Sequence, residues 1–431
     1  MFQLVRAHCH KNVFLIILAL LAVSCSTDDY REFSVADSSI DNMILTATEI
    51  ASMGPRNAGT PQEERIADMI VDRMKEDKII VSRQRFEFQT FGIDSAFLVV
   101  DGETFMPEFI GMNPFIGPVD FQGEMVLYDE IIELEEGQNK VMIADRPEVF
   151  FMALQAASNK FVMLSSEDYS RLKEQPSRSA QLIVKGKVAT RSSSNIEAVL
   201  GNNDSDAGAV YLTAHYDSYL ESPGANDNGT GLAALLEMGS MLKQVERSLP
   251  VNVHLVFMGA EEVGILGSRV YVNTHIEALK DCKLVINFDT FGGDEGPYIA
   301  VTKGVNGTPE EGIRDQLDPV MLNRALEGPE GKWRLLHPAL FPLVTANNYP
   351  KWVQDIVDSA ANALDMEIYT RSLMSDHLSF AQAGIPAVSI QSREHQIHSV
   401  NDTPKNMNSE TIASCFLLSW EVMKQLLQAN E

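Results

Sequence analysis

A histidine and an acid stand two residues apart in the middle of the chain. His215 and Asp217 close an apolar segment, and residues two apart on an extended chain project to the same side. Asp217 can therefore hold the second ring nitrogen of His215 and fix the tautomer that binds a metal. Alone the pattern is weak, because a hydrogen-bonded histidine in the core is the more common outcome.

Four further acidic residues follow, in three separate stretches of the chain. Asp227 lies in the glycine-rich stretch 223–231, Glu261 and Glu262 are adjacent at the end of an apolar run, and Asp289 ends the next one. Each has an ordinary explanation, because an Asp can cap a helix and adjacent acids can form an exposed turn. Neighbouring side chains in a turn can also diverge, so that one carboxylate binds a metal while the other faces a bound water.

His398 completes the set. It lies four residues before Asp402 and follows an apolar segment at 387–390. Two imidazoles and three carboxylates at the ends of successive strands can supply two zinc ions around one shared Asp. One further Glu then does not bind a metal and can interact with a bound water.

Apolar segments of strand and helix length alternate around these residues. Strands are predicted at 208–214, 251–258 and 284–288, with helices at 231–244 and 267–278. This alternation predicts a largely parallel sheet covered by helices on both faces. In such sheets ligands bind beyond the carboxyl ends of the strands, where the polar residues above are found.

The first half of the chain reads differently. Apolar residues at helical spacing run from 40 to 78, with a break at Met53-Gly54-Pro55 and a second helix start at Thr60-Pro61. A strand is predicted at 81–91. The stretch 95–176 has short strand-like pieces and one helix-like segment at 147–157, which predicts a small β-rich insert. The predicted organisation is a signal peptide (1–24), a lipidated tether (25–37), the first part of a catalytic domain (38–94), the insert (95–176) and the main catalytic part (177–431).

The amino terminus reads as a targeting segment. Arg6 and Lys11 precede an apolar run at 13–23. A basic start and an apolar stretch of about 7 to 15 residues are typical of a secretory signal peptide. Residues 22–24 resemble a relaxed bacterial lipobox, so Cys25 is a candidate for lipidation and for a membrane anchor. We expect an outer-membrane lipoprotein facing the periplasm or the cell surface; plain secretion is the alternative.

Composition excludes some classes of protein. The 60 acidic residues outnumber the 34 Lys and Arg, and the net charge of −26 argues against nucleic acid as a partner. With 45% hydrophobic residues the chain can build a sizeable core. After export, Cys282 and Cys415 would be buried thiols or form one bridge; their spacing is not that of a structural zinc site.

These motifs resemble, in order and spacing, the secreted di-zinc aminopeptidases, a metallopeptidase family that also includes glutamate carboxypeptidase and the one-zinc glutaminyl cyclases. The similarity covers about 38–91 and 192 to the end. It implies an α/β fold with a mixed, largely parallel sheet sandwiched by helices. The insert resembles a reduced protease-associated domain, notably at 139–146. The stretches that carry the family resemblance are 54–56, 59–61, 215–217, 224–228, 259–268, 287–289, 375–377 and 398–402.

The resemblance also implies roles. Asp227 would bridge two zinc ions, with His215 and Asp289 on one ion and Glu262 and His398 on the other. Glu261 would be the general base, and Asp217 would support catalysis. Peptides would be the substrates. A negative patch near the zinc ions would hold a free α-amine, which favours an aminopeptidase over an endopeptidase.

Two positions depart from the family. Relatives often carry an Arg and a Tyr, both able to stabilise an oxyanion, where this chain has Met374 and Ile397. His377, Arg371 and His395 are the candidates for that role. Alternatively, Asp376 caps the next helix and His377 is its partner.

Other functions stay open at this point. A glutaminyl cyclase would need one zinc, held by Asp227, Glu262 and His398. A non-catalytic binding protein on the same fold is the third candidate. The preferred terminal residue, carboxypeptidase or dipeptidase activity, and the oligomeric state are not fixed by the sequence.

Overall fold

The computed structural model describes most of the chain. The described residues are 30–31, 34–107, 109–111, 118–127, 140–145, 160–176, 178–201, 208–219, 221–300, 349–368, 370–371, 375–393 and 396–429. The predicted signal peptide and Cys25 lie outside these ranges, as does the helix-like segment at 147–157. Within them, no helix is both long enough and apolar enough to cross a bilayer.

Among the described residues, thirteen strands form one mixed sheet. From one edge the order is β12(Thr370–Arg371), β11(Glu295–Ala300), β13(Ala387–Arg393), β10(Cys282–Asp289), β8(Ala209–His215), β9(Asn252–Met258), β7(Ser179–Leu200), β4(Val119–Leu127), β5(Lys140–Ala144), β6(Lys160–Met163) and β3(Phe109–Gly111), while β1(Ile80–Val100) pairs with β7 and with β2(Glu103–Phe105). The central strands β13, β10, β8 and β9 are parallel to one another. β7 and β11 flank this group as antiparallel strands. The mixed, largely parallel α/β sheet is therefore confirmed.

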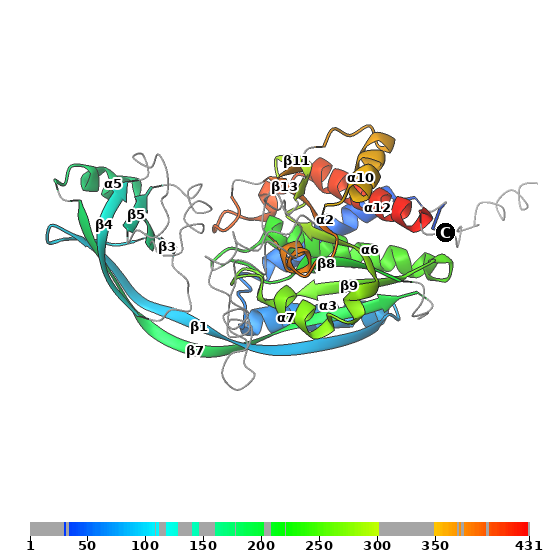
Figure 1. Cartoon of the computed structure of the whole chain (residues 1–431), viewed down its shortest axis with the longest axis horizontal. Helices are drawn as coiled ribbons and strands as arrows, with labels where there is room; N and C mark the ends of the chain where they lie inside the picture. Colours follow the sequence, from blue (N-terminus) through cyan, green and yellow to red (C-terminus); the bar gives the residue numbers. More distant parts are fainter. Residues whose placement is uncertain are drawn as a thin grey trace, which may run out of the picture.

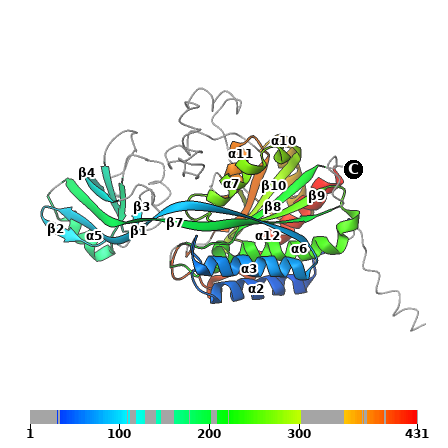
Figure 2. The ribbon, with the colours of Figure 1, turned by 90° about the horizontal axis from the view of Figure 1, so that it is seen from below.

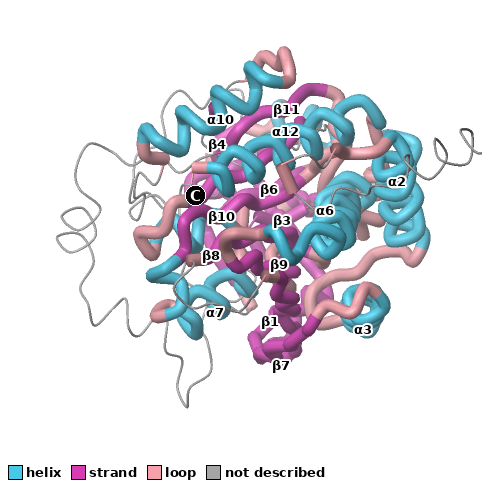
Figure 3. The backbone as a smooth tube through the Cα atoms, turned by 90° about the vertical axis from the view of Figure 1, so that its right-hand side faces the viewer, coloured by secondary structure: helices cyan, strands magenta, loops and turns pink. Residues whose placement is uncertain are grey.

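Helices cover both faces of the central strands. These elements are α2(Asp37–Ser52), α3(Pro61–Glu76), α6(Gly231–Val245), α7(Leu266–His275), α10(Lys351–Ala363), α11(His377–Gln382) and α12(Ser409–Gln428), with short turns η4(Ala225–Thr230), η5(Glu246–Ser248), η6(Ala278–Asp281) and η9(Pro404–Asn406). Figures 2 and 3 show β8, β9 and β10 between α6 on one side and α7 on the other.

Alternate residues of each central strand belong to different cores. Leu212 and Leu255 pack with α2, α3, α6 and α12, whereas Tyr211 and Val256 pack with α7 and α11. Side chains on a strand alternate between faces, so a strand covered on both sides must be apolar throughout. This explains why these strands read as unbroken apolar runs. Cys282 and Cys415 are both free thiols.

The start of α3 follows its sequence signals. Thr60 is the N-cap, its side chain accepts a hydrogen bond from the backbone N–H of Glu63, and Pro61 is the first helical residue. Pro needs no partner for an N–H there, and acids in the first turn complement the helix dipole. The break predicted at 53–55 separates α2 from α3, as expected.

The two longest strands leave the sheet together. β1 and β7 pair in antiparallel register from Ile80 opposite Val199 to Val99 opposite Gln181. Ile196 of β7 is level with Phe257 near the end of β9, so the earlier residues of β7 run on past the carboxyl end of the parallel strands. Figure 1 shows this curved ribbon leading away from the helix-covered sheet.

The ribbon ends in a small unit that we call the distal lobe, the described residues from 96 to 184. It contains β2 to β6 and α5(Ser166–Lys173), a helix that the sequence analysis did not identify. Its apolar core, which includes Leu98, Val141 and Leu182, is separate from the cores of the central sheet. β1 runs without interruption through the predicted boundary at 94–95. The likeness to a protease-associated domain stays a prediction.

Candidate metal centre

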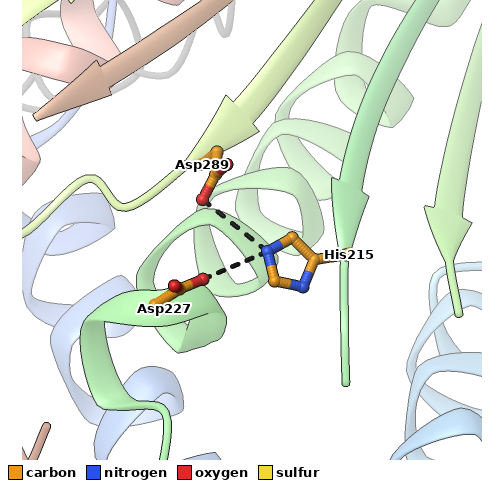
Figure 4. A group of neighbouring side chains, drawn as sticks. All are labelled: His215, Asp227 and Asp289. Atoms are coloured by element: carbon orange, nitrogen blue, oxygen red, sulfur yellow. Dashed lines mark ion pairs between the residues drawn. The ribbon is translucent and has the colours of Figure 1, made fainter. Parts of the chain in front are cut away.

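One group of possible metal ligands lies where β8 and β10 end. The Nε2 atom of His215 is 3.2 Å from Asp227 Oδ1 and 3.6 Å from Asp289 Oδ1. All three residues are buried. Figure 4 shows the imidazole facing both carboxylates, from the end of one strand towards the end of its neighbour and towards η4.

A second group shares Asp227. The Nε2 atom of His398 is 3.1 Å from the other oxygen of Asp227, Oδ2, and 3.3 Å from Glu262 Oε2. Each group offers three donor atoms that lie within 4.8 Å of one another. The five residues that the sequence analysis assigned to metal binding are therefore brought together, with Asp227 between the two imidazoles.

The donors suit zinc. Ligands about 2.0–2.1 Å from a tetrahedral ion lie about 3.3 Å from each other, which matches the nitrogen–oxygen distances of both groups. Histidine nitrogens and carboxylate oxygens are the appropriate atoms. Glu262 Oε1 is buried and has no hydrogen-bond partner among the described residues, so an acceptor is left for a cation.

Asp227 is held by its backbone. The carboxylate of Asp402 accepts the N–H groups of Asn226 at 2.8 Å and of Asp227 at 3.0 Å. The side chain of Asn228 donates to Phe288 O at 2.9 Å and accepts from the N–H of Thr290 at 3.1 Å. This second pair of bonds ties the Asp227 turn to the strand end that carries Asp289.

Asp217 makes contacts that differ from the predicted one. Its Oδ1 lies 3.5 Å from His215 Nδ1, but Nδ1 has no hydrogen-bond partner among the described residues, so the support of His215 by Asp217 stays a prediction. The two oxygens of Asp217 accept the backbone N–H groups of Glu261 at 3.0 Å and Glu262 at 3.1 Å. Asp217 therefore fixes the turn from which both glutamates project, which the His-x-Asp spacing alone did not indicate.

The ionisable groups influence one another strongly. Burial opposes charge on Asp227, but hydrogen bonds from His215 and His398 outweigh it and lower the pKa of this carboxyl. Burial opposes charge on both imidazoles, but the charge of Glu261 near His215 and that of Glu262 near His398, followed by the contacts with Asp227, raise the pKa of each. Burial and the neighbouring Asp227 charge raise the pKa of Glu262 to about 7.

Glu261 lies among other acids. Burial raises its pKa well above the usual value, and the charges of Asp376, Glu262 and Asp289 raise it further, while His215 opposes them. A carboxylate that is reluctant to stay charged accepts a proton readily. This is the behaviour expected of a general base that must hold a proton for part of a reaction.

Three ligand-bearing turns contain a left-handed residue. Ala260 precedes Glu261 with φ 57°, Thr290 follows Asp289 with φ 53°, and His398 itself has φ 61°. Residues other than glycine seldom adopt this region, and they concentrate at functional sites. These turns are therefore shaped to aim side chains at one place.

The predicted oxyanion residues are less well placed. His377 begins α11 and is completely buried. Asp376 is the N-cap of that helix, but its side chain makes no capping hydrogen bond. Arg371 lies in β12, with a side chain outside the description, and Met374 and His395 lie outside the described residues. A role for any of these in oxyanion binding stays a prediction.

Sequence reasoning missed Tyr219. Its ring stacks on that of His398, with centroids 4.6 Å apart and an angle of 29° between the planes. Burial raises the pKa of the Tyr219 hydroxyl, and the neighbouring charge of Glu262 raises it further. Its position two residues after Asp217 was the only signal, and it does not indicate contact with a histidine 179 positions later.

The chain is similar to known proteins over the stretches that carry the proposed ligands. The model of peptidase family M28 matches residues 195–326 and 341–423. Aminopeptidase YwaD of Bacillus subtilis is 29% identical over 273 residues, which cover 56% of this chain and 59% of YwaD. The "Probable lipoprotein aminopeptidase LpqL" of Mycobacterium tuberculosis is 43% identical over 96 residues, 22% of this chain and 19% of that protein. The chain thus spans less than two thirds of these relatives.

A solved structure shares the fold. The zinc aminopeptidase BSAP from Bacillus subtilis superposes with a TM-score of 0.60 and 21% identity, over 90% of this chain and 94% of that one. At this identity the match establishes the architecture, including the helix-covered mixed sheet.

Proposed function

The chain belongs to peptidase family M28, and from this premise we propose that it is a zinc-dependent exopeptidase that removes amino-terminal residues from peptides. The observation that carries the proposal is the sharing of Asp227 between two sets of ligands, with Glu261 beside them. The names of YwaD and LpqL support the reaction type.

We propose two zinc ions per chain. His215 and Asp289 would hold one ion, Glu262 and His398 the other, and Asp227 would bridge them. When bound, such a pair of ions lowers the pKa of a coordinated water and polarises a peptide carbonyl. The buried carboxylates supply the negative charge that the ions need.

The residues of the chain would then manage the protons. Glu261 would take a proton from the attacking water and deliver it to the nitrogen of the scissile bond, which becomes the amino terminus of the shortened peptide. Asp217 would hold the backbone of Glu261 and Glu262 in place, because its carboxylate accepts both of their N–H groups. The acidic surroundings favour a substrate with a free α-amine, which supports an aminopeptidase over an endopeptidase.

Replacement of Glu261 by Gln tests this role. Gln keeps the shape of the side chain but cannot accept the proton, so we expect kcat on aminoacyl-nitroanilides to fall about 10²- to 10⁴-fold. Zinc content, measured on the same sample, should stay that of the unmodified protein. Glu277→Gln is the control, because Glu277 is exposed and its ion pair among the described residues is with Lys280, three positions later. Undiminished kcat in Glu261→Gln with zinc bound would remove Glu261 from the mechanism.

Metal stoichiometry separates this proposal from the glutaminyl cyclase alternative. One zinc per chain, together with pyroglutamate formation from amino-terminal Gln in a peptide library, would favour the cyclase. Two zinc ions and release of free amino acids would favour the aminopeptidase. Absence of zinc uptake would favour a binding protein.

We also propose export and lipid anchoring at Cys25, on the basis of the sequence before that residue and the lipoprotein named among the relatives. Labelled palmitate should enter the full chain and not its Cys25→Ala variant. Equal labelling of both would exclude this anchor.

A further inference from the structure

A completely buried arginine contacts the loop that joins two of the proposed metal ligands, His215 and Asp227. Arg56 is 0% exposed and belongs to the connection between α2 and α3, outside the residues matched by the family model. We call residues 54–63 the amino-terminal strap. A buried cation is costly unless it is well paired, so its surroundings are informative.

The guanidinium of Arg56 is occupied by backbone carbonyls. Nε donates to Tyr216 O at 2.7 Å, Nη1 to Pro223 O at 2.6 Å and Nη2 to Gly224 O at 2.9 Å. These carbonyls lie between His215 and Asp227 in the chain. One side chain therefore gathers both ends of the loop that joins two proposed ligands.

The close approach depends on Gly224. Its φ is +61°, and a Cβ there would lie 2.5 Å from Asp227 O and 2.8 Å from Arg56 Nη1. A residue without a side chain is needed for both reasons. The loop is thus shaped to receive the arginine.

The strap makes further contacts with the loops of the site. The backbone N–H of Arg56 donates to Ser218 Oγ at 3.0 Å, and the side chain of Asn57 donates to Ser218 O at 3.1 Å. Glu63, at the other end of the strap, accepts from Ser193 Oγ and from the N–H of Ala260, the residue before Glu261. The strap therefore reaches two of the turns that carry the proposed metal and proton-transfer groups.

Charge gives Arg56 a second effect. Burial lowers its pKa, but the charges of Asp402, Asp217, Asp227 and Glu262 oppose this. The carboxylates of the site repel one another, and a cation fixed near them offsets part of that repulsion. Without this cation, the repulsion would tend to push the carboxylates apart when no metal ion neutralises them.

We propose that Arg56 is a positioning residue of the metal centre. By holding the carbonyls of Tyr216, Pro223 and Gly224, it fixes His215 and Asp227 in the arrangement that receives zinc, and it thereby sets the affinity for the metal. The inference rests on the proposed zinc function, but its test needs no peptidase activity. Groups that orient ligands typically change metal affinity 10- to 100-fold when removed.

The test compares zinc affinity in Arg56→Met and Arg56→Lys with that of the unmodified full-length protein. Affinity is measured by competition with a chromophoric chelator, at a temperature at which circular dichroism shows each variant folded. We expect about a 10- to 100-fold loss for Arg56→Met. Lys keeps the charge but lacks the planar fork that serves three carbonyls, so we expect a smaller loss for Arg56→Lys.

Arg269→Met is the matched control. Arg269 is also buried, and burial alone lowers its pKa to about 9. Its loss should reduce thermal stability and leave the zinc affinity within twofold. If Arg56→Met does not fold, Arg56→Lys decides the question.

The outcomes distinguish the two proposals. A folded Arg56→Lys or Arg56→Met variant that binds zinc within twofold of the unmodified protein would overturn the positioning role. Equal losses of zinc affinity in the Arg56 and Arg269 variants would also overturn it, since burial of any arginine would then suffice. Failure of the unmodified protein to take up zinc would instead overturn the proposed function.

Discussion

The metal-centre edge of the sheet and the distal lobe are built on different principles. Among the described residues, the buried charged groups lie outside the lobe, and those at the edge include Arg56, His215, Asp217, Asp227 and Asp289. The lobe buries side chains such as Leu98, Val141 and Leu182. Its stability therefore comes from apolar burial, whereas the edge depends on charged and polar groups that compensate one another.

This difference between the edge and the lobe indicates where the needs of function and of stability oppose each other. A buried carboxylate that is poised to bind a cation is unfavourable to the protein alone, so its replacement can stabilise the fold while it removes activity. Replacement of a buried leucine in the lobe lowers stability with no such gain. Substitutions at the edge should therefore reduce activity and can raise stability, whereas those in the lobe should reduce stability alone.

Among the substitutions that compare these two regions, the largest effect is expected at Glu262. Glu262→Gln should remove one of two zinc ions and reduce kcat/KM by about 100-fold or more. Because the pKa of Glu262 is raised to about 7, its charge is disfavoured in the folded protein, and the metal-free variant should melt a few degrees higher at pH 8. Zinc content, kinetics and calorimetry of the metal-free protein check both halves. A lower melting temperature in the variant would contradict the compensation argument.

The next effect separates the cores. Leu182 is fully buried in the lobe, and Leu182→Ala should cost about 2–5 kcal/mol of lobe stability. We expect faster hydrogen exchange in the lobe and an unchanged zinc affinity. Leu255→Ala, in the core under the central strands, is the matched control and should weaken zinc binding as well. Equal losses of zinc affinity in both variants would show that the two regions are not independent.

The smallest effect concerns pH. Burial, with the nearby Asp217 charge, raises the pKa of Glu63 to about 8. The folded protein then binds more protons than the unfolded chain between about pH 4.5 and 8, so stability is greatest at the acidic end and falls as pH rises through 8. In the metal-free protein, Glu63→Gln should make the melting temperature fall less as pH rises, by a few degrees over this range.

Glu64→Gln is the control for that measurement. Although burial opposes it, the ion pairs with Arg85 and Arg83 lower the pKa of Glu64, so its contribution changes only below its usual pKa. The slope between pH 6 and 8 should therefore stay as it is. A slope that is unchanged in Glu63→Gln would remove Glu63 as its source.

The central strands were predictable because burial on both faces leaves a simple pattern. The strand predicted at 251–258 is β9 at 252–258, and that predicted at 284–288 lies within β10. The ribbon was not predicted as one unit, because beyond the sheet it leaves the core that imposes the pattern. Its pairing joins residues about a hundred positions apart, as in Phe88 opposite Arg191.

The site divides in the same way. Ligands such as Asp289 could be predicted because they end apolar strands, and such ends converge in a parallel sheet. The role of Arg56 could not, because a lone arginine between two helices usually lies on the surface. Its partners are backbone carbonyls some 160 positions away, and they leave no mark in residue type.

The antiparallel course of β1 and β7 has a consequence for how such a protein diversifies. The chain departs for the lobe and returns from it on adjacent strands, and Phe86 and Phe88 pack against Ala260 and Leu266 at the base. Beyond this anchor the two strands need only a hairpin turn to close. Recombination could therefore shorten, enlarge or replace the lobe as one unit without displacing the residues of the metal centre.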